Sequence, residues 1–518
     1  MLGKNSGQID VFDHMIFEKL IPKDHLLVKI DSIIDFSFVY DKVQDKYSSL
    51  GRSSKDPIMM LKILLLEYLY RLSDIEVVSR IKTDVAFRWF LGLSIYDSVP
   101  DDTTISHFRV NRLGEEHFEE FFNEIVKQCI NKDLIKTKRY MIDSTDVAAN
   151  VNYPSDKKLI RNAYRNVIKE IEKFDEDLAK EQIDKFESEI EQEYENNERV
   201  SAKRHYEIAD KHLNYLYLKT YDELQSNDKY KEAFGVCYDI IDQYINSKGD
   251  KIVSVVDPDA RVAHKSPGNI KRGYKNHIIV DEDSEIILAS VQTPFNINDE
   301  KKLKELIEKV DTNLGIKPEE ISADKAYGTI DNRAYLKDNE IVSNIAFYKE
   351  SSREKESFGL KDFEIDADVN SVICPNGIKS TEFKVVNDKD KIYKKFKIYQ
   401  KIYDKCELRD QCFYKGKNGK STAKSKFLMV PIRYDAMLQD MDRVESEAFK
   451  KAYNKRYKVE RRYATLVLNH GLRRCRYVRL ERAKIHITLA NMACNIIRMV
   501  NLLCHPSVAT PWNLKELQ

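Results

Sequence analysis

The feature that most constrains the fold is a set of short apolar segments separated by a long interruption. RYMIDSTDV, residues 139–147, is an apolar run that ends in acids, which predicts a β-strand delivering a carboxylate at its end. Residues 153–249 then repeat apolar side chains at helical spacing among Glu and Lys, which predicts an inserted helical hairpin or bundle. Strand patterns return at residues 251–262, 274–281 and 285–294, the last two joined by turn residues.

The segments that follow complete an alternating pattern. Asp299 can cap a helix, and EEISADKAYG predicts a strand that ends at Asp324. A short helix around residues 332–336 and a strand at residues 342–348 come next. Three antiparallel strands, a helix, a fourth strand, a helix and a fifth strand are the order of a ribonuclease-H-like α/β domain.

The regions around this domain differ in character. Residues 1–135 predict a helical N-terminal domain, in which Asp56 followed by Pro57 starts a helix and residues 75–91 form another. Short helices with basic ends suit a DNA-binding module, and a plain helical bundle fits the pattern equally well. We therefore predict an α/β ribonuclease-H-like catalytic domain with a helical N-terminal domain and a largely helical insertion.

The predicted domain boundaries follow from these patterns. The catalytic domain covers residues 136–500 and is interrupted by a helical insertion at 153–250 and a Cys-containing insertion at about 350–430. Residues 501–518 form a C-terminal tail. A chain of 518 residues is too long for one ordinary core, so more than one domain is expected.

Charge is unevenly distributed along the chain. The formal net charge is +1, yet twelve basic residues and two acids lie between Lys451 and Lys484. Such a segment predicts a polyanionic partner, although a solvated helix face explains it as well when taken alone. The first residues lack the apolar stretch of a secretory signal, and the apolar run Ile58–Leu72 is too short to span a bilayer, so we expect a cytosolic protein with no membrane partner.

Three carboxylates are candidates for a shared site. Asp143 and Asp324 each end a predicted strand, and the fold would bring these strand ends together. Glu460 lies in the basic stretch YNKRYKVE, where helical spacing puts it on one face with Tyr453 and Arg456. Glu460 is either half of an ion pair with Arg456 or a third metal ligand, and Asp146 is an alternative to Asp143 as the first.

These segments resemble the DDE transposases of bacterial insertion sequences. Tyr453, Arg456 and Glu460 match the Tyr-x2-Arg-x3-Glu signature of that family, whereas Val467 stands where many members have Lys. The N-terminal stretches GRSSKDPIMMLKILLLEYLYRLSD and DDTTISHFR resemble the helical N-terminal domain of these proteins. The remaining matching motifs are IDST, DPDARV, GYKNH, TPFNIND and ADKAYG.

The resemblance implies cleavage of insertion-sequence ends and their joining to target DNA by two Mg²⁺ (or Mn²⁺) ions. Asp143 would bridge both ions, while Asp324 and Glu460 would each complete one. Double-stranded DNA, both terminal inverted repeats and target, would be the partner of a homodimer. The residues expected to contact it are Tyr453, Arg456, Arg461, Arg462, Arg473 and Arg474. A nuclease without strand transfer, or a DNA-binding protein derived from an inactive transposase, are the rival functions.

Three cysteines are candidates for a second metal site, which would bind zinc. Cys374, Cys406 and Cys412 resemble the Cys-containing insertion of some of these transposases, which predicts a zinc site, but a structural zinc site normally has four ligands. Packing is the other interpretation, and it is the one expected for Cys129, Cys237, Cys475, Cys494 and Cys504.

Overall fold

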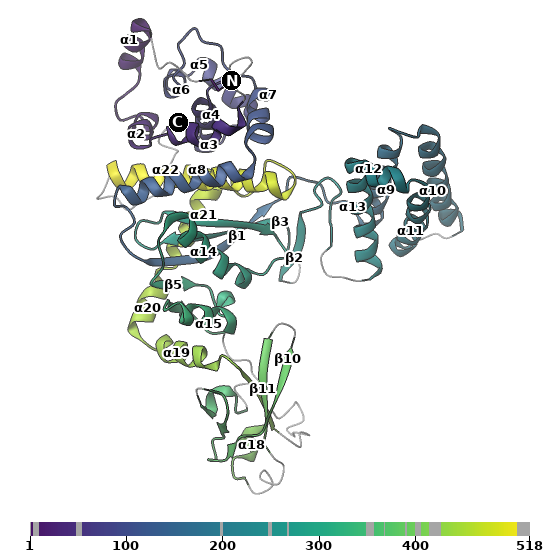
Figure 1. The fold of residues 1–518 in the computed structure, drawn as a ribbon, viewed down its shortest axis with the longest axis vertical. Helices are drawn as coiled ribbons and strands as arrows, with labels where there is room; N and C mark the ends of the chain where they lie inside the picture. Colours follow the sequence, from purple (N-terminus) through teal and green to yellow (C-terminus); the bar gives the residue numbers. More distant parts are fainter. Residues whose placement is uncertain are drawn as a thin grey trace.

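The structure is a computed structural model that places four regions along and beside one axis. Figure 1 shows the N-terminal helices at the top, a β-sheet in the middle, a helical insertion to one side and a small β-rich region at the bottom. The described residues are 2–3, 10–47, 54–196, 200–246, 251–266, 269–348, 357–366, 368–388, 391–398, 406–413 and 426–504.

The central sheet has six strands in the order β2-β3-β1-β5-β6, and β4 also pairs with β3. β1 pairs with β3 in antiparallel orientation and with β5 in parallel orientation, and β5 pairs with β6 in parallel. The predicted order of three antiparallel strands (β1, β3 and β4), a helix, a fourth strand, a helix and a fifth strand is present, with β2 as an additional edge strand beside β3. The bounds are β1 Arg139–Ala148, β2 Arg261–Ser266, β3 Asn269–Asp281, β4 Ile287–Pro294, β5 Glu320–Ala323 and β6 Val342–Ile345.

The predicted strand at residues 251–262 is mostly wrong. Ile252 forms an isolated bridge with Arg261, and regular pairing starts at β2. Pro258 lacks a backbone N–H and interrupts a ladder there, while the buried Asp257 carboxylate accepts a hydrogen bond from the Tyr274 hydroxyl. An apolar run alone does not reveal such a break.

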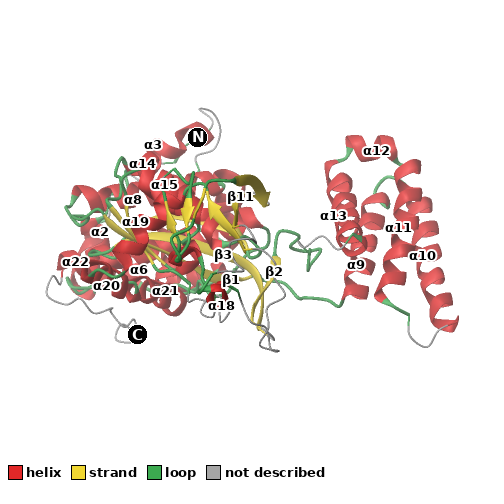
Figure 2. Ribbon diagram, turned by 90° about the horizontal axis from the view of Figure 1, so that it is seen from below, coloured by secondary structure: helices red, strands yellow, loops and turns green. Residues whose placement is uncertain are grey.

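Helices surround the sheet, as Figure 2 shows. α8 (Glu115–Asn131), α14 (Leu303–Leu314) and α22 (Leu480–Cys504) all contact β4, and α15 (Ile330–Asp338) contacts β6. The N-terminal helices share one hydrophobic core with this sheet, because α22 also contacts α2 and α4. The boundary at residue 135 stays a prediction.

The N-terminal region confirms the predicted helix start at Asp56. The Asp56 carboxylate accepts hydrogen bonds from the N–H groups of Ile58 and Met59, with Pro57 in the first turn. The single helix expected at residues 75–91 is wrong, because Asp84 ends one helix and caps the next through the N–H of Phe87. The helices are α1 Val11–Leu20, α2 Leu26–Ile33, α3 Phe38–Val43, α4 Pro57–Leu69, α5 Asp74–Thr83, α6 Val85–Phe90 and α7 Asp102–His107, followed by a π-helical stretch, Phe108–Leu113.

The helical insertion has its own hydrophobic core, and Figure 1 shows it standing apart from the sheet. Its helices are α9 Asp156–Ile171, α10 Glu176–Asn196, α11 Ala202–Lys219, α12 Tyr221–Ser226 and α13 Asp228–Ile245. The helical spacing that predicted an inserted bundle is thus explained by burial of one face of each long helix.

A third core lies in the Cys-containing region. Two small antiparallel sheets build it, β7-β8-β9 and β10-β11-β12. The chain then passes through α19 (Tyr434–Val444), α20 (Glu447–Asn454) and α21 (Tyr457–Asn469) back to the central sheet. The other bounds are β7 Glu364–Ile365, β8 Val372–Ile373, β9 Lys379–Ser380, β10 Phe383–Asp388, β11 Lys391–Ile398, α18 Arg409–Cys412 and β12 Lys426–Pro431.

α22 is a long helix with a strongly apolar stretch. Its length and composition would allow it to cross a membrane, but 78% of its most apolar window is buried inside the protein. It packs between the N-terminal helices and the sheet, as the core helix of a globular protein does. α22 extends to Cys504, so the predicted tail starts inside this helix, and residues 505–518 lie outside the described residues.

Candidate active site

Asp143 and Asp324 are neighbours because of strand register. β1 and β5 run parallel, and their last paired residues are Ile142 and Ala323. Each aspartate is the next residue along its strand direction, so the two carboxylates leave the sheet side by side. Asp143 does not end its strand as predicted, since β1 continues to Ala148 against β3. What ends at Ile142 is the parallel pairing with β5.

Arg456 joins these two carboxylates. Its Nη2 lies 3.3 Å from Asp143 Oδ2, and its Nη1 lies 3.8 Å from Asp324 Oδ1. The Asp143 side chain is 20% exposed and that of Asp324 is 42% exposed, so the pair opens to solvent on one side. A single cation thus sits between two carboxylates that remain accessible.

The stretch YNKRYKVE is not one helix. α20 ends at Asn454 and α21 begins at Tyr457, with tight i to i−3 hydrogen bonds between them, including Arg456 N–H to the carbonyl of Tyr453. The guanidinium of Arg456 lies 5.4 Å from the ring centre of Tyr453, which in turn stacks on Phe449. With this break between the helices, the Tyr453 ring packs against the guanidinium of Arg456 in a cation–π contact.

Glu460 lies one turn after Arg456 on α21. Tyr463, three residues further, donates its hydroxyl to the backbone oxygen of Asp143 at 2.6 Å, so this helix is held against β1. Glu460 is exposed and has no hydrogen bond or ion pair with any residue that the structure describes, and the alternative ion pair with Arg456 is therefore absent among them. Within the described ranges, no group of three or more His, Cys, Asp or Glu side chains is arranged to hold a metal ion.

The environment of Asp143 shifts its ionisation. Burial raises the pKa of Asp143 to about 6, against the opposing effects of the Ser144 N–H, which donates to Oδ1 at 2.8 Å, and of Arg456. The nearby carboxylates of Asp324 and Asp299 raise the pKa further. This carboxylate therefore favours a site in which a cation compensates its charge.

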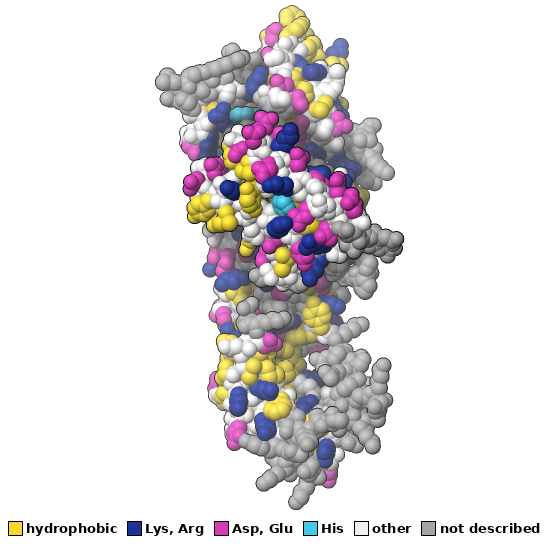
Figure 3. Space-filling model, turned by 90° about the vertical axis from the view of Figure 1, so that its right-hand side faces the viewer, with side chains coloured by type: hydrophobic (Ala, Val, Ile, Leu, Met, Phe, Trp, Pro, Cys, Tyr) yellow, Lys and Arg dark blue, Asp and Glu magenta, His cyan; other side chains and the backbone are white. Residues whose placement is uncertain are grey.

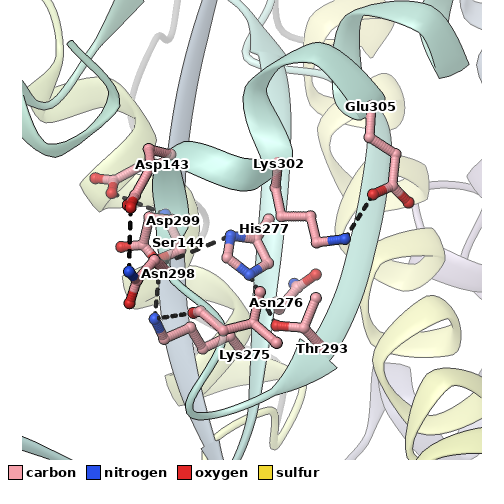
Figure 4. A network of polar contacts seen from close by, with 12 residues as sticks. Asp143, Ser144, Lys275, Asn276, His277, Thr293, Asn298, Asp299, Lys302 and Glu305 are labelled. Carbon is pink, nitrogen blue, oxygen red and sulfur yellow. Dashed lines mark hydrogen bonds and ion pairs between the residues drawn. The ribbon is translucent and has the colours of Figure 1, made fainter. Parts of the chain in front are cut away.

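Asp299 belongs to a polar network that the sequence did not predict. Its carboxylate accepts a hydrogen bond from Lys275 Nζ at 2.8 Å, and the same Nζ donates to the backbone oxygen of Ile297. The His277 ring lies fully buried beside it, with Nε2 3.0 Å from Thr293 Oγ1 (Figure 4). Burial lowers the pKa of His277 to about 4, so its ring is neutral, as expected for a structural histidine.

The predicted DNA-contacting arginines fall into two groups. Arg461 and Arg462 both pair with the buried Glu285, and the Arg462 residue is 3% exposed. Arg473 and Arg474 are exposed in a loop between α21 and α22, not in a helix as predicted. Backbone hydrogen bonds with Ala148 fix this loop against the end of β1. The first group pairs with a buried carboxylate, whereas the second is exposed beside the strand that carries Asp143, with Arg473 Nη1 3.1 Å from Asp146 Oδ2.

Comparisons with known proteins identify the family. A family model described as "Transposase domain (DUF772)" matches residues 15–111, and one described as "Transposase DDE domain" matches residues 248–496. The chain belongs to the DDE transposases of insertion sequences. A 22% identical relative, "Uncharacterized protein ORF8 in nfe locus" of Rhizobium meliloti, aligns over 174 residues, 33% of this chain and 83% of the relative. No solved structure matches the chain significantly.

The two matched ranges assign both the N-terminal helices and the later part of the chain to transposases. Transposases act on DNA, so DNA is the partner class of this transposase. The family models cover the N-terminal helices and the later strands of the sheet, whereas β1 and the helical insertion lie between the two matched ranges. Asp143 thus lies outside both ranges, and its assignment depends on the register with β5.

The cysteines of this transposase are all free thiols. Cys374, Cys406 and Cys412 line one small cavity of about 10 Å³ in the third core, and the pKa of Cys412 is raised by burial and by the other two. They do not form a metal-ligand group in this structure, and the zinc site stays a prediction. Packing explains Cys129, Cys237, Cys475 and Cys494, which are buried, but not Cys504, which is exposed.

Proposed function

We propose that this transposase cleaves the ends of its insertion sequence and joins them to target DNA by divalent-metal phosphoryl transfer. The observation that carries this proposal is the bridge of Arg456 between Asp143 and Asp324, 3.3 and 3.8 Å away. The two carboxylates supply hard oxygen donors beside each other, already arranged around a positive charge. The strand order supports a ribonuclease-H-like catalytic domain around them.

Asp143, Asp324 and Glu460 are the residues that would hold two Mg²⁺ or Mn²⁺ ions. When bound, the ions activate the attacking hydroxyl and stabilise the leaving 3′-oxygen of an in-line displacement. The carboxylates of Asp143 and Asp324 fit this task because both face one cation and remain partly exposed. Glu460 has no competing partner among the described residues, which leaves its carboxylate available.

Arg456 has a second task once a metal is bound. Its guanidinium presents paired N–H donors that suit a phosphate group, and Tyr453 holds it in place. With the two aspartates engaged as metal ligands, the Arg456 guanidinium would be available to orient the scissile phosphate. Tyr453 is thereby a positioning residue for Arg456.

Arg473 and Arg474 would contact the DNA at a distance from the carboxylates. They lie beside Ala148, five residues along β1 from Asp143, which is about 17 Å of strand. Contacts at that distance would fix the duplex on its phosphates without reading its sequence. Arg462 would have to leave its buried pair with Glu285 to reach DNA, so we do not include it.

The proposed substrate is double-stranded DNA with the terminal inverted repeats of the element, and then target DNA. Bringing two ends together requires two active sites, so a homodimer on DNA in the bacterial cytoplasm is the proposed assembly. Two rivals are kept: a nuclease that cuts without joining, and a transposase-derived protein that binds without cutting.

The test is a cleavage assay on DNA carrying the flanking sequences of the gene, with Mg²⁺ or EDTA. Wild type is expected to nick and join in Mg²⁺ alone, whereas Asp143→Asn and Glu460→Gln bind DNA and lose at least about 1,000-fold in rate, as when the metal-based activation is removed. Asp146→Asn is the matched control, because Asp146 pairs with Lys271 and Arg473 and is expected to leave cleavage within about tenfold of wild type.

Three outcomes separate the proposal from its rivals. Cut but unjoined ends would favour the nuclease. DNA binding by wild type without metal-dependent cutting would favour the binding protein. Loss of activity in Asp146→Asn and not in Asp143→Asn would move the first ligand to Asp146.

A further inference from the structure

The small sheet β10-β11-β12 has one face that the proposed active site does not use. Antiparallel pairing places Lys384 opposite Lys395, Val386 opposite Tyr393 and Lys397 opposite Phe427. Because directly paired residues share one face of a sheet, these side chains lie together. We call this set the ribbon face: Lys384, Val386 and Asp388 of β10, Lys391, Tyr393, Lys395 and Lys397 of β11, and Phe427 and Met429 of β12.

The opposite face of this sheet packs into the third core, which leaves the ribbon face toward solvent. Phe396, Ile398, Leu428 and Val430 alternate with the ribbon-face residues and are buried in the third core. Phe383, Val385 and Ile392 on that opposite face are exposed, but none of the ribbon-face residues is buried, so the ribbon face is open along its length. Figure 3 shows Lys or Arg side chains beside hydrophobic side chains on the lower part of the molecule, where β10 and β11 lie.

Charge on the ribbon face is unbalanced. It carries four lysines and one acid, Asp388. Lys384 and Lys395 stand directly opposite each other, an arrangement of like charges that destabilises a sheet. Lys384, Lys391 and Lys395 have no ion pair with an acid anywhere in the described ranges. Asp388 stands opposite Lys391, but Lys384 and Lys395 face each other with no acid opposite either, and this excess of cations favours an anionic partner.

Aromatic side chains lie among these cations. Phe427 is 47% exposed, and Lys395 Nζ lies 4.4 Å from the centre of its ring. Tyr393 lies between Lys391 and Lys395 on the same face of β11. Basic residues gathered on one exposed face give the positive surface typical of a protein that binds nucleic acid, and the Phe427 ring holds Lys395 on that face.

We infer that the ribbon face binds the phosphate backbone of duplex DNA. This inference rests on the proposed function, because it assigns a second contact to the DNA held at the carboxylate site. The lysines lie on two adjacent strands, β10 and β11, so they present positive charge to neighbouring phosphates of a duplex. The contact gives affinity without sequence choice, as expected for Lys and for a face with few hydrogen-bond acceptors.

The first test removes charge from the ribbon face. The triple variant Lys384→Gln, Lys391→Gln, Lys395→Gln keeps its sheet, because none of the three is in the buried core. Lys397 is left unchanged because it has an interaction of its own. The matched control is Lys219→Gln, Lys229→Gln, Lys231→Gln, which removes three exposed lysines from the helical insertion.

Binding to duplex DNA is measured in EDTA between about 50 and 200 mM salt, with thermal unfolding as a check of folding. Each lost phosphate contact lowers the slope of log affinity against log salt by about 0.9. The ribbon variant is expected to lose about two to three in slope and about 10- to 100-fold in affinity, and the control to match wild type. An unchanged slope in the folded ribbon variant overturns the inference.

A second test needs no substitution. Lysine acetylation followed by mass spectrometry is compared with and without DNA, and protection of Lys384, Lys391 and Lys395 by DNA is expected. Protection that appears without DNA and grows with protein concentration would assign the face to a second copy and overturn the inference. If wild type cuts DNA normally while these lysines stay unprotected, the ribbon inference fails and the proposed function stands. If wild type binds no duplex, both fail.

Discussion

Two clusters of arginine and carboxylate in this transposase have similar parts and different surroundings. In the first, Arg109 pairs with both oxygens of Asp74 at 3.2 and 2.6 Å and lies 3.7 Å from Glu67, which Arg476 also approaches to 3.5 Å. Glu67 is completely buried. In the second, Arg456 alone stands between Asp143 and Asp324, which are partly exposed.

The two clusters differ in burial and in the number of cations around the carboxylates. Burial raises the pKa of Glu67 to about 8 and that of Asp143 to about 6. Around Glu67 two arginines close the cluster, Arg109, which precedes α8, and Arg476, which follows α21. The first cluster therefore ties the N-terminal helices to the segment that follows α21, while the second leaves carboxylate oxygens exposed, as the proposed metal site requires.

The largest effect on stability is expected from breaking the closed cluster. Arg109→Met leaves Glu67 and Asp74 with a missing partner inside the protein, which costs about 3–5 kcal/mol of unfolding free energy. Urea denaturation measures it. A loss below about 1 kcal/mol would show that water or Arg476 replaces the lost cation.

The open cluster should respond in activity instead. Arg456→Gln removes a donor to phosphate and is expected to slow cleavage about 10- to 100-fold. Mn²⁺ binding, measured by electron paramagnetic resonance, should become tighter, because the variant no longer has a cation beside Asp143 and Asp324. Weaker Mn²⁺ binding would contradict the view that metal displaces Arg456.

The pH dependence of metal binding tests whether Asp143 is a metal ligand. Asp143 is protonated below its pKa of about 6 and must lose that proton to bind a cation. Mn²⁺ affinity is therefore expected to be constant well above pH 6 and to fall about tenfold per unit below it. Asp143→Asn should bind more weakly with no such break, and a break that persists in this variant would assign the proton to another group.

The smallest effect is expected at an exposed pair. Arg473→Ala removes the contact with Asp146, at 3.1 Å, from a side chain that is 53% exposed. Unfolding free energy should fall by less than about 1 kcal/mol, while the salt slope of DNA binding should fall by about 0.9. A larger loss of stability with an unchanged salt slope would make Arg473 a structural residue.

The meeting of Asp143 and Asp324 depends on the register of β1 with β5, but local patterns in the sequence determined most of the strand order and the helix start at Asp56. These depend on periodicity, caps and turns, which short segments encode themselves. The motif match to a known family added Glu460, whose position on α21 the structure places one turn from Arg456. Its role as a ligand stays a prediction.

Tertiary structure alone decided which charges meet. The sequence could not show that Arg462 is buried on Glu285, or that Arg109 and Arg476 converge on Glu67 from segments more than 350 residues apart. Nor could it show that Arg456 faces Asp143 and not Glu460. An ion pair depends on distance and burial in three dimensions, and both are set by packing between elements that no local pattern records.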